Sequence, residues 1–327
     1  MRGVAARAGV SVATVSRFYS GAGPVSDDAR VRVKEAADAL GYVPNTAARS
    51  LRVQRTATLG VVLPDLYGDF FSELLRGLDG AARLHDRHLL VAGSHGGADE
   101  LAETACQMLG RVDGLIVMCP GLGEEVAEAN LPVGLPVVLL GSMATGFPSI
   151  SVDDEASAAA MVRHLAHLGH RRIALIAGPS ANADALDRLA AYERTVGDLG
   201  LHADPSLVVE GDFTERSGHQ ATCQLLALAD RPTAVFAAND SMAIGALRAC
   251  REAGLDVPGD IALAGFDDIP VAEYVTPGLT SVHVPIHEMG ARAVSAVLAA
   301  VDDPSVVADP VVLPGRLVVR QSCGGAA

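Results

Sequence analysis

The chain has 327 residues, half of them hydrophobic, and a formal net charge of −14, which is the composition of a globular protein of about two or three domains. No apolar run approaches the roughly 18 residues of a membrane span, and the opening MRGVAARAGVS lacks the apolar segment of a signal peptide, so we expect a cytoplasmic protein. The five cysteines lie at least thirteen residues apart, which excludes a disulfide framework and a zinc-finger pattern.

Charge is distributed unevenly along the chain. Residues 1–55 contain nine Arg or Lys and four Asp or Glu, a net charge of +5, which leaves −19 for the remainder. Such asymmetry is typical of a nucleic-acid-binding module joined to an acidic domain, although +5 over 55 residues also fits ordinary scatter.

Residues 1–44 are predicted to form three short helices. The first spans residues 4–8 and ends at Gly9; Ser11 caps the second, which continues to residue 19. Ser26 caps the third, whose apolar residues share one face: Val33, Ala36, Ala37 and Leu40. Residues 45–57 are too poor in apolar residues to fold alone, and we interpret them as a hinge helix and linker.

From residue 58 to residue 327, short apolar runs alternate with helical stretches. Near-continuous apolar runs separated by helices are typical of parallel strands buried on both faces. The pattern predicts an α/β, doubly wound domain with two similar lobes, near 58–150 and 151–275, and two late short strands. The runs are residues 59–64, 88–93, 113–118, 136–141, 172–178, 234–239 and 260–266.

The segment AGVSVATVSRFYSG (8–21) has the pattern of a helix-turn-helix. Gly9 permits a steep crossing of two helices, and the second carries Thr14, Ser16 and Arg17 on its outward face. Hydroxyl groups hold phosphates and Arg reads guanine in the major groove, so this face suits DNA. A small helical subdomain with a polar face is the alternative.

The longer stretches VAARAGVSVATVSR and VSDDARVRVKEAADALGYVPNTAARSL resemble the LacI/GalR family of bacterial transcriptional regulators, as do VRHLAHLGHRRIALIAGP and FAANDSMAIGALRACREAGLDVPGDIALAGFDD. The resemblance covers nearly the whole chain. It implies a helix-turn-helix head, a hinge helix and a two-lobed domain like that of periplasmic binding proteins. It also implies a homodimer on a palindromic operator whose affinity is switched by a small molecule.

The resemblance assigns DNA-binding roles by position. Val12, Ala13 and Arg17 match positions that face bases, and Ser11, Thr14 and Ser16 match phosphate-binding positions. Asn45 and Ala48 fall in the hinge, and Leu51 matches a leucine that inserts into the minor groove. Phe18, Tyr19 and Ser20 replace the aliphatic-Asn ending usual in the family, a departure that bears on base preference.

Polar residues follow several predicted strands, where ligands of such folds bind in the crevice between lobes. These residues are Asp65, Asp153, Asn239 and Asp267, and Arg188 lies on a following helix. Phe70 and Phe71 could stack on a sugar. The resemblance assigns pocket positions to these residues other than Phe71, and also to Asp184, and it places Val284 where Gln is common. Asp267 could instead hold a turn, and Asp240 could cap a helix.

We expect the effector to be a sugar or sugar derivative, with a nucleobase as the alternative. An enzyme is disfavoured: GLGEEV (121–126) is a poor dinucleotide motif, no GxxxxGK[ST] occurs, and GSHGG has the wrong order for a nucleophile elbow. The triplet His164, His167 and His170 suggests zinc only weakly, because Gly169 ends the helix before its third member. We therefore expect no catalytic residue, metal or cofactor. A solute-binding protein would share the two lobes but leave the basic head unexplained.

Overall fold

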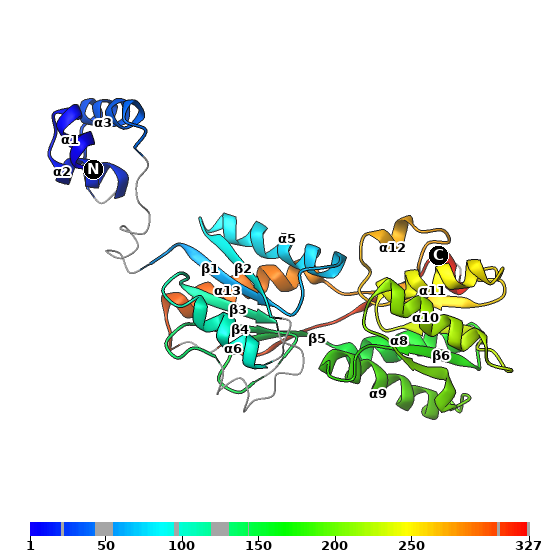
Figure 1. Ribbon diagram of the computed structural model, residues 1–327. Helices are drawn as coiled ribbons and strands as arrows, with labels where there is room; N and C mark the ends of the chain where they lie inside the picture. Colours follow the sequence, from blue (N-terminus) through cyan, green and yellow to red (C-terminus); the bar gives the residue numbers. More distant parts are fainter. Residues whose placement is uncertain are drawn as a thin grey trace. The chain divides into compact units, whose positions relative to one another are not determined.

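The computed structural model describes residues 1–20, 23–42, 55–94, 98–118, 131–142, 144–305 and 308–325. The chain divides into two compact units, residues 1–56 and residues 57–327. Three helices are followed by alternating strands and helices, as the sequence predicts (Figure 1). Within the described parts of the chain, no helix is long and apolar enough to cross a membrane.

The first unit consists of three helices around a small apolar core. They are α1 (Arg2–Ala8), α2 (Val12–Ser20) and α3 (Asp27–Ala39). Gly9 ends α1 in the left-handed conformation, with φ of 62°, which glycine adopts without steric cost. The Ser26 hydroxyl accepts a hydrogen bond from the Ala29 backbone N–H and so caps α3. The buried core residues are Val4, Ala5, Ala8, Val15, Val33, Ala36 and Ala37.

The first lobe of the second unit contains a six-stranded parallel sheet in the order β11-β5-β4-β3-β1-β2. Its strands are β1 (Thr58–Leu63), β2 (His88–Gly93), β3 (Gly114–Met118), β4 (Val137–Leu140), β5 (Ser149–Val152) and β11 (Val311–Leu313). Helices α5 (Asp69–Leu84) and α13 (Ile286–Asp302) pack together, and α6 (Ala98–Gln107) contacts β1. Alternate residues of β1 and β3 join different apolar clusters, which confirms strands buried on both faces.

Close approach of α5 and α13 depends on glycine. A Cβ atom added to Gly77 of α5 would lie 2.3 Å from the backbone oxygen of His287 on α13. Glycine at this position therefore allows the two helices to pack closely.

The second lobe contains a four-stranded parallel sheet in the order β7-β6-β8-β9. Its strands are β6 (Ile173–Ala177), β7 (Val208–Glu210), β8 (Ala234–Ala237) and β9 (Ala262–Ala264). Helices α8 (Asp154–His167) and α9 (Ala183–Asp198) pack together, as do α10 (Glu215–Leu226) and α11 (Asp240–Glu252). The short helix α12 (Val271–Tyr274) and the 3-10 turns η1 (Pro205–Leu207) and η2 (Gln321–Cys323) complete the lobe.

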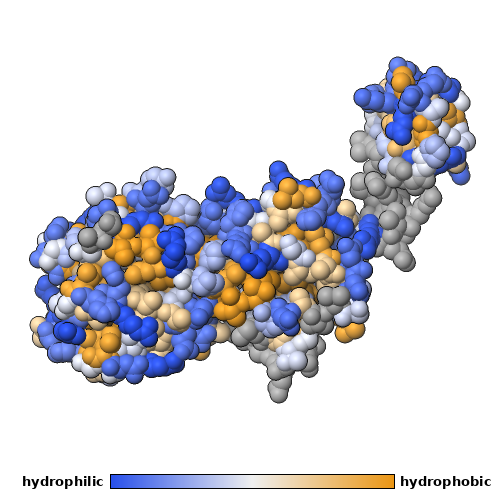
Figure 2. Space-filling model, turned by 180° about the vertical axis from the view of Figure 1, so that it is seen from behind, coloured by the Kyte–Doolittle hydropathy of each residue, from blue (hydrophilic) through white to orange (hydrophobic). Residues whose placement is uncertain are grey.

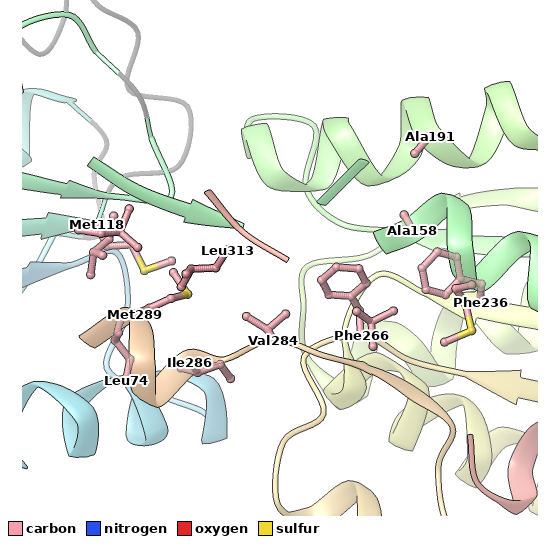
Figure 3. Packing of buried hydrophobic residues seen from close by; sticks show 14 of the residues in the cluster. Leu74, Met118, Ala158, Ala191, Phe236, Phe266, Val284, Ile286, Met289 and Leu313 are labelled. Carbon is pink, nitrogen blue, oxygen red and sulfur yellow. The ribbon is translucent and has the colours of Figure 1, made fainter. Parts of the chain in front are cut away.

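The lobes are interleaved along the chain. The chain enters the second lobe after β5, returns through β10 (Ser281–His283) to α13, and crosses again between β11 and β12 (Arg316–Val318), which pairs with β10. Figure 3 shows Val284 at one of these crossings, between Met289 and Ile286 on one side and Phe266 on the other. The two late strands of the prediction are β11 and β12.

Candidate functional site

The N-terminus of α2 is the exposed part of the helix-turn-helix. Ser11, Val12, Ala13 and Arg17 are exposed, whereas Val15 is buried in the core of the unit. The Ser11 hydroxyl accepts a hydrogen bond from the Thr14 backbone N–H at 3.0 Å and lies 2.9 Å from the Thr14 hydroxyl. The helical period of α2 therefore leaves the predicted base-facing residues Val12, Ala13 and Arg17 on the outer surface and buries Val15 in the core.

Phe18 and Tyr19 pack against the core of the first unit. Their rings meet edge to face with centroids 4.9 Å apart, and Tyr42 lies 5.9 Å from Tyr19. The unusual end of α2 therefore contributes to the fold of the head. The predicted hinge residues Asn45, Ala48 and Leu51 lie outside the described residues, as does the GLGEEV segment.

A cavity in the second unit lies at the carboxyl ends of strands from both lobes. Seven of the eight predicted ligand residues line it: Asp65, Phe70, Phe71, Asp184, Arg188, Asn239 and Asp267. The segment following β1 and Met118, the last residue of β3, contribute from one lobe, and segments following β6, β7, β8 and β9 contribute from the other.

Asp153 is placed differently from the prediction. It does not line the cavity; its Oδ1 accepts a hydrogen bond from the Ala156 N–H at 2.9 Å and caps α8. The neighbouring Asp154 points to the buried arginine instead. In this turn Asp154, and not Asp153, contacts the cavity arginine, and ligand binding by Asp153 stays a prediction.

Arg188 is buried at the centre of the site. Its Nε donates to Asp154 Oδ1 at 2.6 Å, and its Nη1 donates to the Ala238 backbone oxygen at 2.6 Å. The guanidinium carbon lies 3.9 Å from the centroid of the Phe266 ring, a cation–π geometry. Nη2 lies 3.9 Å from Asp267 Oδ1, which is beyond hydrogen-bonding distance.

Carboxylates outnumber the guanidinium in this cluster. Burial raises the pKa of Asp267 to about 7, in spite of Arg188. Burial and the charge of Asp154 raise the pKa of Asp184 to about 7. Burial lowers the pKa of Arg188, but Asp154, Asp267 and Asp184 outweigh it and raise that pKa overall. The guanidinium is therefore a permanent charge, and near neutral pH Asp184 and Asp267 are partly protonated.

Asp267 and Asp268 both adopt positive φ, 99° and 55°, which is strained for residues other than glycine. Asp268 pairs with Arg320 at 2.7 Å and with His283 at 3.1 Å, and the Ile269 N–H donates to Asp240 at 2.9 Å. These bonds hold the loop in the conformation that brings Asp267 to the cavity.

Asn239 has a structural task as well as a place in the cavity wall. Its Oδ1 accepts from the Met242 N–H and caps α11, and its Nδ2 donates to the Phe213 backbone oxygen at 3.0 Å. Asp240, the alternative cap, is instead the first residue of α11 and is fully buried, where Ser281 donates to it at 2.6 Å.

Comparison with known proteins decides the family. Residues 1–45 match the family described as bacterial regulatory proteins, lacI family, and residues 162–323 match the periplasmic binding protein-like domain. Catabolite control protein A of Priestia megaterium is 35% identical over 98% of this chain and 97% of its own length. The chain belongs to the LacI family of bacterial transcriptional regulators.

Solved structures agree with this assignment. A Lac repressor dimer bound to operator and the anti-inducer ONPF has a TM-score of 0.87, with 32% identity, and covers 98% of this chain and 97% of that one. A CelR–cellobiose complex has a TM-score of 0.73, with 32% identity over 98% of both chains. GalR of Escherichia coli is 35% identical over 93% of this chain and 89% of its own length. The predicted family, fold and regulatory function are confirmed.

Several cavity residues of this LacI-family regulator were missed by the sequence analysis. Asp212 and Phe213 line the cavity after β7, a strand of only three residues that had no recognisable apolar run. Tyr67 and Asn182 line it as well. The signal that could have found Tyr67 is its place between the end of β1 and the phenylalanines of α5.

The histidine triplet takes separate partners. His164 Nε2 lies 3.4 Å from Cys323 Sγ, and His170 Nδ1 lies 3.0 Å from the Thr233 hydroxyl. Across the described ranges, no group of three or more metal-ligating side chains comes together. Nothing in these placements favours zinc.

Proposed function

We propose that this LacI-family regulator is a homodimeric repressor that acts on a palindromic operator, and that a sugar bound between the lobes of its second unit changes its operator affinity. The observation that supports the effector site most directly is the ring of polar groups and aromatic faces around one buried guanidinium. Asp184, Asn239 and Asp267 can accept or donate hydrogen bonds to hydroxyl groups, and Phe70 and Phe71 offer apolar faces.

The homodimer follows from the geometry of half-sites. One recognition helix per chain needs two copies to read a palindrome, and the Lac repressor relative is described as a dimer on its operator. Figure 2 shows hydrophobic residues at the surface of the second unit. Leu84, on α5, is 86% exposed. Light scattering that gives a monomer at micromolar concentration would contradict the dimer.

We assign the cavity to binding and not to catalysis. Its arginine is already held by Asp154 and the Ala238 backbone oxygen, and the relatives of this chain are transcriptional regulators. We also propose that the protein acts in the bacterial cytoplasm, where its operator DNA is found. No resident cofactor is proposed.

A thermal-shift screen of the full chain tests the effector. The panel contains sugars, sugar phosphates and purines, since a ligand that binds the folded state raises the melting temperature. The hit must then change operator affinity, because switching needs differential affinity for two states. A purine hit with no sugar hit would overturn the sugar proposal.

Arg17→Ala is expected to weaken specific operator binding by about 1–3 kcal/mol and to relax specificity at one base pair per half-site. Arg17 is exposed on α2, where its guanidinium can reach a base edge. Fluorescence anisotropy on operator variants measures the loss. Lys34→Ala, on α3, is the control for general charge loss; if both variants lose affinity equally on operator and random DNA, Arg17 does not read bases.

Leu51→Ser is expected to weaken operator binding while leaving non-specific binding and its salt dependence largely intact. We propose that the leucine inserts at the operator centre, where an apolar side chain between base steps kinks the duplex. Anisotropy on operator and random duplexes over a salt series separates the two modes. Parallel losses on both duplexes would show that Leu51 is no wedge.

A further inference from the structure

The cavity between the lobes is lined by an excess of carboxylates. Five aspartates line it, and Arg188 is the cationic side chain among the described lining residues. The aspartates are Asp65, Asp69, Asp184, Asp212 and Asp267. Hydrogen bonds from Thr214 and Ser217 lower the pKa of Asp212, so its carboxylate is charged at neutral pH.

Arg188 does not balance this charge. Its Nε and Nη1 donate to Asp154 and to the Ala238 oxygen, both at 2.6 Å, and its carbon lies over the Phe266 ring. Of its three nitrogens, only Nη2 has no hydrogen bond within the described residues, so one partly engaged guanidinium faces five carboxylates. A phosphate or carboxylate in the cavity would therefore meet more negative than positive charge.

Asp267 has an acceptor atom with no partner. The residue is only 5% exposed, and its Oδ1 makes no hydrogen bond within the described residues. The nearest cation, Arg188 Nη2, lies 3.9 Å away. A buried acceptor without a donor is costly, so a ligand that donates a hydrogen bond to this atom would satisfy it.

Asp184 is the second carboxylate aimed at the ligand space. It lies in the first turn of α9 in the second lobe, yet a Cβ atom on Gly141 of the first lobe would lie 3.3 Å from its Oδ2. Its carboxyl group makes no hydrogen bond among the described residues, and burial raises its pKa to about 7. The side chain therefore lies beside both lobes, and a cation placed next to it would favour its ionised form.

We propose that the effector is cationic: a polyhydroxylated compound with a protonated amine, such as an amino sugar. This proposal rests on the function proposed above. Its ammonium pairs with Asp184, and one of its N–H or O–H groups donates to Asp267. Sugar phosphates and sugar acids are excluded by the surrounding aspartates. Because Asp184 reaches the first lobe, the ammonium also stabilises the lobe arrangement in which both carboxylates face it.

Matched sugar series test this charge preference. Binding to the full chain is measured by calorimetry at pH 7 for glucosamine, galactosamine and mannosamine, each beside its parent sugar, its N-acetyl derivative and its 6-phosphate. N-acetylation keeps the substituent but removes the positive charge. We expect one amino sugar to bind at least about tenfold more tightly than its parent and its N-acetyl derivative, and the 6-phosphates to bind more weakly than any of them.

Asp184→Asn should reduce the affinity for that amino sugar about tenfold or more, while Asp187→Asn, on the same helix but outside the cavity wall, should leave it unchanged. Equal or tighter binding of a parent sugar overturns the cationic effector and leaves the sugar proposal standing. Tighter binding of a 6-phosphate overturns the charge argument itself. If no sugar in any series binds at millimolar concentration, both proposals fail.

Discussion

Replacing Arg188 by alanine is expected to lower the free energy of unfolding of the second unit by about 3–5 kcal/mol, because it leaves a buried carboxylate cluster without its cation. Asp154 loses its 2.6 Å hydrogen bond, Asp267 loses its nearest positive charge, and Phe266 loses the guanidinium above its ring. Any hit of the effector screen should lose its thermal shift in this variant. Urea unfolding measures the stability, and calorimetry below the melting transition measures the binding.

An exposed ion pair provides the control for this variant. Arg194 of α9 pairs with Glu155 of α8, and both side chains are more than half exposed, at 56% and 54%. Arg194→Ala should therefore cost at most about 1 kcal/mol. The double variant Arg188→Met with Asp154→Asn should recover part of the loss, since the stranded carboxylate becomes neutral. If Arg188→Ala is as mild as Arg194→Ala, the arginine does not hold the site together.

Much of this site follows from the sequence because two simple rules operate in it. Apolar runs separated by helices fix parallel strands, and the carboxyl ends of such strands meet at one edge of the sheet. Asp65, Asn239 and Asp267 each follow such a run, and all three line the cavity. Likewise the helical period determines which side of α2 faces outward, because it buries Val15 and exposes Val12.

The roles of individual residues are harder to predict where two neighbouring residues could each take the same role. Asp153 and Asp154 are both chemically able to cap α8 or to bind Arg188, and the first helical turn settles the choice by directing Asp153 to Ala156. At α11, Asn239 both lines the cavity and caps the helix, whereas Asp240 accepts a hydrogen bond from Ser281. Phe213 was missed because the preceding strand, β7, has only three residues. Its backbone also has a positive φ of 67°, which the residue type does not predict.

The stability of the folded chain is expected to fall as the pH rises from about 5 to about 8, by a few kcal/mol. Asp184 and Asp267 have folded-state pKa values of about 7, well above the ordinary aspartate value of 3.8 that applies to the unfolded chain. Between these values the folded state binds more protons than the unfolded state, so each rise in pH favours unfolding. Asp154 has a raised pKa as well, chiefly through burial, and acts in the same direction.

Two substitutions separate this linkage from a general effect of pH. Asp184→Asn removes one of the raised groups, so its plot of unfolding free energy against pH should be flatter between pH 5 and 8 than that of the unsubstituted chain. Asp204→Asn should leave the slope unchanged there, because hydrogen bonds from Ser206 and Arg172 lower the Asp204 pKa to about 2 and the group is ionised throughout this range. Urea titrations at half-unit pH intervals measure both slopes. A stability that stays constant or rises toward pH 8 in the unsubstituted chain would mean that the aspartates around Arg188 are fully ionised in the folded state.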